Sequence, residues 1–124
     1  MPLQLDTGKE NLEMFFKDWQ VTALRYLWSI RPEGANTKTV WENVNQSLQG
    51  SISRASIINY LYAMAEEGLL TYTETTGKGG HQRVYTMKYD ETEFKQHIAG
   101  RIITKLLREY PQETRKALAP EVLN

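Results

Sequence analysis

The sequence predicts a mainly α-helical fold that carries one small β-hairpin. Between residues 18 and 67, apolar residues recur at helical spacing in three successive segments. From residue 69 to 89 the pattern changes to two runs rich in Thr, Tyr and Val, the residue types that suit strands. Glycines separate these two runs at residues 77–82, as a hairpin turn requires.

The first helix is expected over residues 18–30, where Asp18 can cap its N-terminus. Residues 31–34, Arg-Pro-Glu-Gly, end it because proline cannot continue the hydrogen-bond ladder. A second helix is expected to begin at a cap formed by Thr37 or Thr39 and to stop near Gly50. Residues 1–17 are expected to form an arm or a short helix.

The third helix can be capped by Ser51 or Ser53, and Gly68 is placed to end it in a left-handed conformation. Strands are then expected over residues 69–76 and 83–89. The second strand and its turn, residues 77–89, contain three basic residues and no acid, although the whole chain has 15 basic and 15 acidic residues and no net charge. A helix followed directly by a hairpin with a basic tip is the architecture of a winged helix-turn-helix.

A fourth helix is expected from Asp90, capped by Asp90 or Thr92, with Glu91 and Glu93 near its positive end, and Pro111 stops it. A short last helix can follow over residues 112–118. The long apolar stripe of the fourth helix is more than so small a domain needs, so we expect residues 90–124 to form a dimerisation segment. Its predicted interface residues are Phe94, Ile98, Ile102, Ile103, Leu106, Leu107 and Tyr110. Packing back on the domain core is the alternative.

Residues 18–89 are the predicted DNA-binding domain. The third helix would read bases in the major groove, since Arg pairs with guanine and Asn with adenine, while its N-terminus and the hairpin would contact phosphates. The candidate DNA-binding residues are Thr39, Ser53, Arg54, Ser56, Asn59, Tyr60, Lys78, His81, Gln82 and Arg83. The plain alternatives are a solvated helix face and a flexible hairpin with ordinary surface charges.

Several other classes of function find no support in the sequence. The absence of cysteine excludes disulfides, thiolate metal sites and cysteine nucleophiles. No histidine–carboxylate cluster or nucleophile motif indicates an enzyme, a metal or a cofactor. No apolar run approaches the length of a membrane span, and residues 1–17 lack the order of a signal peptide, so we expect a cytoplasmic protein. A winged helix that binds another protein remains the rival, with Tyr60 and Tyr62 expected to be exposed.

Five segments resemble winged-helix repressors of the penicillinase-repressor type and, more loosely, of the multiple-antibiotic-resistance type. They are residues 21–28 (VTALRYLW), 39–44 (TVWENV), 54–61 (RASIINYL), 67–70 (EGLL) and 83–85 (RVY). The resemblance covers about residues 18–110 and implies a homodimeric transcriptional repressor that binds palindromic double-stranded DNA. The copper-responsive relatives use C-terminal cysteines, which this chain lacks. The sequence does not identify an inducing signal or a small-molecule effector.

Overall fold

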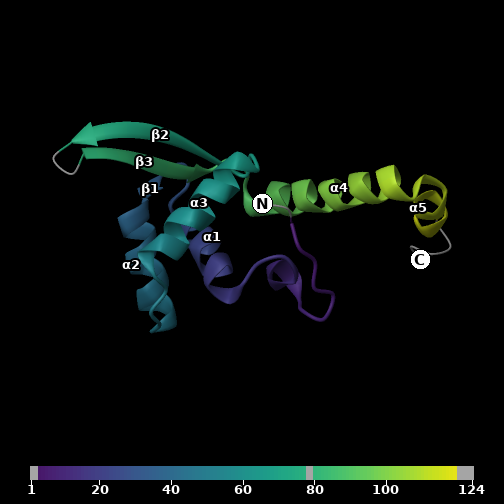
Figure 1. The fold of residues 1–124 in the computed structure, drawn as a ribbon, viewed down its shortest axis with the longest axis horizontal. Coiled ribbons are helices and arrows are strands. Elements are labelled where there is room, and N and C mark those ends of the chain that lie inside the picture. Colours follow the sequence, from purple (N-terminus) through teal and green to yellow (C-terminus); the bar gives the residue numbers. More distant parts are fainter. Residues whose placement is uncertain (1–2, 78–79, 120–124) are drawn as a thin grey trace. The chain divides into compact units, whose positions relative to one another are not determined.

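The computed structural model describes residues 3–77 and 80–119, which fall into two compact units, Met1–Tyr89 and Asp90–Asn124. The first unit contains a 3-10 helix, three α-helices and three strands, and the second contains two α-helices (Figure 1). No helix in the described part of the chain is long and apolar enough to cross a membrane. The elements of the first unit are η1 (Asn11–Met14), α1 (Asp18–Ile30), β1 (Ala35–Asn36), α2 (Thr37–Leu48), α3 (Arg54–Glu66), β2 (Leu70–Gly77) and β3 (Gly80–Met87).

Helix α1 has the expected bounds, but its N-cap is Lys17 rather than Asp18. The backbone N–H of Lys17 donates to Oε1 of Gln20 at 2.9 Å, which satisfies one donor at the open end of the helix. The apolar stripe of α1 is buried, with Leu24 and Leu27 fully inaccessible. The helix ends at Ile30, immediately before the Arg-Pro-Glu-Gly stop predicted from the sequence.

Helix α2 begins at Thr37, and its cap is Asn36 rather than either threonine. The Oδ1 atom of Asn36 accepts a hydrogen bond from the Thr39 backbone N–H at 2.9 Å. Asparagine is a stronger N-cap than threonine, so the residue one position earlier takes the role. Gln49 ends the helix in a left-handed conformation with φ of 50°.

Helix α3 follows the prediction closely at both ends. Ser53 caps it, its Oγ accepting from the Ser56 backbone N–H at 3.1 Å. Ile57, Tyr60, Leu61 and Met64 form its buried face, at the spacing of one helical stripe. Gly68 has φ of 76°, the left-handed conformation that only glycine adopts without cost.

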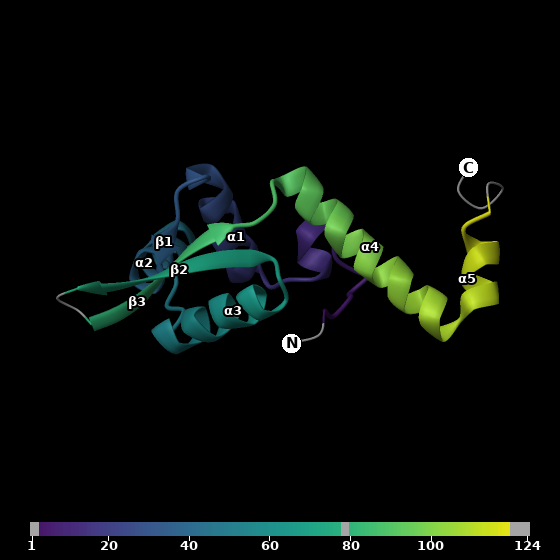
Figure 2. The ribbon, with the colours of Figure 1, turned by 90° about the horizontal axis from the view of Figure 1, so that it is seen from above.

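The three strands form an antiparallel sheet in the order β1-β3-β2. The long hairpin of β2 and β3 extends beyond the helices of its unit, as the two views show (Figures 1 and 2). Its register pairs Leu70 with Met87 at the base and Gly77 with Gly80 at the end, so both strands reach further toward the turn than predicted. The two-residue β1, which the sequence pattern did not indicate, pairs Ala35 with Tyr85. Together with α1–α3, this sheet makes the winged helix-turn-helix expected from the sequence.

The second unit consists of α4 (Glu91–Glu109) and α5 (Pro111–Ala117). Asp90 caps α4 as predicted, and its carboxylate accepts from the Glu93 backbone N–H at 2.7 Å. Pro111 separates the helices and is itself the first residue of α5, the position where its missing N–H costs nothing. The buried Thr114 hydroxyl donates to the Leu106 carbonyl oxygen at 3.0 Å, which links α5 to α4.

Candidate nucleic-acid interface

Helix α3 has a solvent-facing side that carries most of the predicted base-reading residues. Arg54 and Asn59 are exposed there, and Ser56 is half-buried beside them. The guanidinium carbon of Arg54 lies 5.8 Å from the centre of the Trp41 ring of α2, a cation–π distance. Trp41 is itself fixed, because its indole N–H donates to the Ile52 carbonyl at 2.8 Å. Arg54 is therefore held near the start of the helix.

Tyr60, one of the predicted DNA-binding residues, does not belong to this exposed side, which corrects the expectation that it is exposed. Only 3% of its surface is accessible, because it lies three residues after Ile57 and four before Met64 on the apolar stripe. Its hydroxyl donates to the Gln20 carbonyl of α1 at 3.3 Å, and its ring packs edge-on to Trp19 with centroids 5.3 Å apart. Burial raises the pKa of this phenol well above its ordinary value.

The wing is anchored to α3 through Arg83 of β3. Its guanidinium carbon lies 4.3 Å from the ring centre of Tyr62 on α3 and 4.1 Å from that of Tyr72 on β2. Both tyrosines are exposed on their other sides, at 47% and 42%. Arg83 retains 28% of its side-chain exposure, so it is a packed link between helix and wing as well as a surface charge.

An acidic residue of β2, Glu74, faces the basic residues of β3. Its Oε2 lies 2.8 Å from Nε2 of His81, and its Oε1 lies 3.6 Å from Nε of Arg83. Residues 77–89 contain no acid, as the sequence indicates, but the register places Glu74 of the preceding strand directly opposite Arg83. The register runs one to one from the Leu70–Met87 pair to the Gly77–Gly80 pair, so strands predicted to extend to residues 77 and 80 would have paired positions 74 and 83. The broader loop predicted over residues 77–82 concealed this pairing.

A groove of about 410 Å³ lies between the start of α2, the exposed side of α3 and the wing. Burial raises the pKa of the Tyr85 phenol, which lines the groove, and the nearby Arg83 guanidinium lowers that pKa by a smaller amount. Three permanent cations line the groove against one carboxylate, that of Glu74. Its lining residues are Asn36, Thr37, Lys38, Arg54, Ile58, Tyr62, Glu74, His81, Gln82, Arg83 and Tyr85.

The groove brings together Arg54, His81, Gln82 and Arg83 of the predicted DNA-binding set. The Gln82 side-chain Oε1 accepts from Nδ2 of Asn36 at 3.0 Å, which joins the wing to the start of α2. Four other predicted residues, Thr39, Ser53, Ser56 and Asn59, are not among the residues that line it, and Lys78 lies outside the described residues. The sequence reasoning missed Asn36 and Lys38, whose signal was their place at the start of a helix beside the wing.

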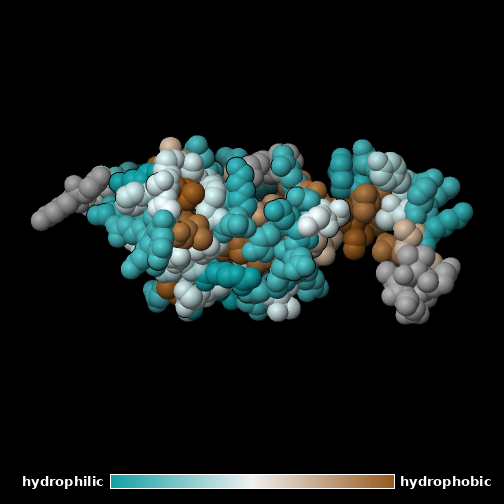
Figure 3. Space-filling view, turned by 90° about the horizontal axis from the view of Figure 1, so that it is seen from below, coloured by the Kyte–Doolittle hydropathy of each residue, from teal (hydrophilic) through white to brown (hydrophobic). Residues whose placement is uncertain are grey.

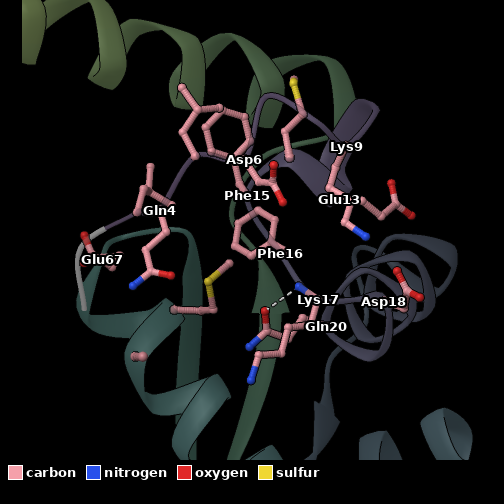
Figure 4. Close-up of a pocket in the computed structure, with 15 residues that line it drawn as sticks. Gln4, Asp6, Lys9, Glu13, Phe15, Phe16, Lys17, Asp18, Gln20 and Glu67 are labelled. Atoms are coloured by element: carbon pink, nitrogen blue, oxygen red, sulfur yellow. Dashed lines mark hydrogen bonds between the residues drawn. The ribbon is translucent and has the colours of Figure 1, made fainter.

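A second cavity, of about 660 Å³, lies on the first unit between the N-terminal segment and the end of α3. Among the residues that line it, Phe15 and Phe16 lie in the middle of the view with Asp6 beside them, while Gln4 and Glu67 lie at one side and Glu13 and Asp18 at the other (Figure 4). The lining contains both apolar and charged side chains and none of the predicted DNA-binding residues.

The predicted interface residues on α4 differ in exposure. Phe94 and Ile98 are buried, and Ile102 and Leu107 are half-buried. Ile103, Leu106 and Tyr110 expose 38%, 39% and 58% of their surfaces. Figure 3 shows hydrophobic side chains gathered on the surface of this helical segment. An apolar surface is thus present on the C-terminal half of α4.

No family model matches the sequence, and no curated protein matches it. The fold is similar to the crystal structure of a proposed transcriptional regulator from Thermoplasma acidophilum, with a TM-score of 0.50 and 18% sequence identity. The similarity covers 73% of this chain and 93% of that one. At this identity the comparison concerns the fold, and it supports neither the penicillinase-repressor type nor the multiple-antibiotic-resistance type in particular. The chain has a winged-helix fold.

Proposed function

We propose that this chain is a transcriptional regulator that binds double-stranded DNA through α3 and the wing. The observation that carries the proposal is the groove beside α3, where Lys38, Arg54 and Arg83 face Glu74 although the whole chain has no net charge. Phosphate binding requires such a local excess of cations rather than a basic protein as a whole. The winged-helix fold supplies the matching geometry, with a helix exposed for the major groove.

Within this proposal the residues divide by role. Arg54 and Asn59, exposed on α3, read base edges. Ser53 and the first N–H groups of α3 meet a phosphate at the positive end of the helix. Lys38 and the wing residues His81 and Arg83 contact the backbone, which positions the protein without selecting sequence.

We further propose that the chain is a homodimeric repressor, with residues 18–89 binding DNA and residues 90–124 joining two copies. The support is the apolar surface of α4, a helix of 19 residues on which Ile103 and Leu106 are exposed, together with the exposed Tyr110 that follows its last residue. Two α3 helices about 34–36 Å apart would match half-sites one helical turn apart in a palindrome.

The test is selection of bound genomic fragments, followed by fluorescence anisotropy titration of a selected fragment and a scrambled one. We expect submicromolar binding of the selected fragment and a steep loss of affinity between about 50 and 200 mM salt, as backbone contacts require. Absence of binding to any fragment at 50 mM salt would refute DNA binding. A reporter gene placed behind the selected fragment distinguishes a repressor from an activator.

The second candidate function is a winged helix that binds another protein. Its support is the pair of exposed aromatic residues beside α3, Tyr62 and Tyr72, because exposed tyrosines are common at protein interfaces. Tyr60, which was also expected to be exposed, gives this function no support because it is buried. The two functions separate experimentally, because Lys38→Ala with Arg54→Ala would weaken DNA binding, whereas protein binding through Tyr62 and Tyr72 would remain.

A further inference from the structure

We propose that Glu74 is an internal counter-ion of the wing, which occupies the place of a DNA phosphate on His81 and Arg83 and limits how strongly the wing binds DNA. The inference rests on the proposed DNA-binding function and concerns the regulation of that same site. It assigns a role to the acidic residue of a groove whose other charged lining residues are basic.

The geometry of the carboxylate resembles that of a bound phosphate. Glu74 directs one oxygen to each of the two side chains, Oε2 to His81 at 2.8 Å and Oε1 to Arg83 at 3.6 Å. Phosphate and carboxylate oxygens accept hydrogen bonds from the same donors with similar geometry. A phosphate can therefore contact these two side chains fully only when Glu74 turns away.

The pairs are open to exchange, because the partners are accessible to solvent. Glu74 has 44% and His81 59% of the side chain exposed. Exposed ion pairs of this kind contribute little to folding, so a stronger or better placed anion can replace the carboxylate.

Arg83 keeps its position when the carboxylate leaves. The rings of Tyr62 and Tyr72 hold the guanidinium at 4.3 and 4.1 Å from their centres, and neither contact involves Glu74. The cation is thus placed in advance for an anion, and removal of Glu74 alone leaves the donor in place. Glu74→Gln keeps the shape of the side chain and removes only its charge.

Counter-ion release gives this proposal a measurable signature. Each phosphate neutralised by a protein cation adds about 0.9 to the magnitude of the slope of log Kobs against log salt. When a phosphate only replaces Glu74, the freed carboxylate attracts a cation from solution, and the net number of cations released on binding is smaller. In Glu74→Gln no carboxylate is freed, so the phosphate contact adds its full contribution of about 0.9 to the slope.

The experiment compares wild type, Glu74→Gln and Glu33→Gln by anisotropy titration on one genomic fragment selected with the full chain, from 50 to 200 mM salt. Glu33 is an exposed acid in the turn after α1 and does not line the groove, so it controls for the loss of one negative charge. We expect Glu74→Gln to bind more tightly than both, with an advantage about 3.5-fold larger at 50 mM than at 200 mM for one additional phosphate contact. The double variant Glu74→Gln/Arg83→Gln should lose that added slope.

Circular dichroism first establishes that each variant is folded. Equal slopes for all three proteins, with DNA binding intact, would overturn the role of Glu74 and leave the proposed function standing. If neither wild type nor Glu74→Gln binds any DNA at 50 mM salt, both proposals are wrong. A steeper slope for Glu74→Gln than for Glu33→Gln supports both.

Discussion

The side-chain amide of Asn45 on α2 is hydrogen-bonded to both polar groups of the Ile52 backbone. Its Oδ1 accepts from the Ile52 N–H at 2.6 Å, and its Nδ2 donates to the Ile52 carbonyl at 3.1 Å. Ile52 is the residue before the cap of α3, so this one side chain fixes where the exposed helix begins. The turn between α2 and α3 is therefore defined by side-chain bonds as well as by its own backbone.

Replacement of Asn45 by alanine should lower stability and weaken DNA binding together. The Ile52 N–H would lose its partner and the Ile52 carbonyl one of its two donors, at a cost of about 1–3 kcal/mol. Urea unfolding measures the first effect and anisotropy titration the second. Asn43→Ala is the matched control, because the Asn43 amide bonds to Thr39 within the same helix. Equal losses in the two variants would show that Asn45 has no special role in this turn.

Gly34 is expected to tolerate no side chain. A Cβ at this position would lie 2.6 Å from Oγ1 of Thr86 and 2.7 Å from the Tyr85 carbonyl oxygen, so β1 and β3 would have to separate. Gly34→Ala should destabilise the fold by about 1–3 kcal/mol, as measured by equilibrium unfolding. Gly100→Ala on α4 meets nothing within 4 Å and should be neutral or stabilise by up to about 1 kcal/mol. A neutral Gly34→Ala would contradict the close approach of the strands.

Alkaline pH should destabilise the first unit through Tyr60. Its pKa is raised by burial, so its stabilising contribution is complete below the ordinary tyrosine pKa of about 10 and is lost as the pH rises toward the folded value. Thermal unfolding at pH 7 and pH 10.5 should show a smaller alkaline loss for Tyr60→Phe than for wild type. Burial also raises the pKa of Tyr85, so part of the alkaline loss of stability will remain in Tyr60→Phe. Identical pH profiles would argue against a buried Tyr60.

Arg54 and Asn59 are expected to set sequence preference. Loss of either side chain should cost about 1–3 kcal/mol at the base pair that it contacts and little elsewhere. Titration of a panel of single-base variants of a selected fragment measures this directly. Arg83→Ala serves for comparison, since a backbone contact should weaken binding to every sequence alike. A uniform loss for Arg54→Ala would instead assign that residue to a phosphate.

The apolar surface of α4 should determine oligomeric state. Leu106→Lys places a charge on the exposed face and is expected to shift a dimer toward monomer in sedimentation velocity experiments. Thr104→Lys adds the same charge at an exposed polar position of the same helix and should leave the dimer intact. A dimer that survives Leu106→Lys would place the interface elsewhere.

Local sequence signals predicted the helix ends well, because caps act within one turn. Ser53, Gly68 and Asp90 take the roles expected from their residue types. Asn36 was missed because the two threonines that follow it are also capping residue types, and the first helix begins one residue after Lys17 although Asp18 was the expected cap.

The candidate site was harder to predict, because its contacts join distant segments. Glu74 meets Arg83 only through the hairpin register, and Arg83 meets Tyr62 only when the wing folds over α3. The burial of Tyr60 was within reach of helical periodicity, since its position continues the stripe of Ile57 and Met64. The sequence analysis wrongly included Tyr60 in the solvent-exposed face of the third helix.

The contact of Arg83 with Tyr62 bears on the shape of the DNA in the proposed complex. Because the wing is packed on α3, the protein would set the distance between the proposed major-groove contacts of α3 and the proposed backbone contacts of the wing. In a complex, a site whose minor-groove width or bend differs from that spacing would have to deform to fit. The deformability of base steps that the protein never touches would then contribute to which sites it selects.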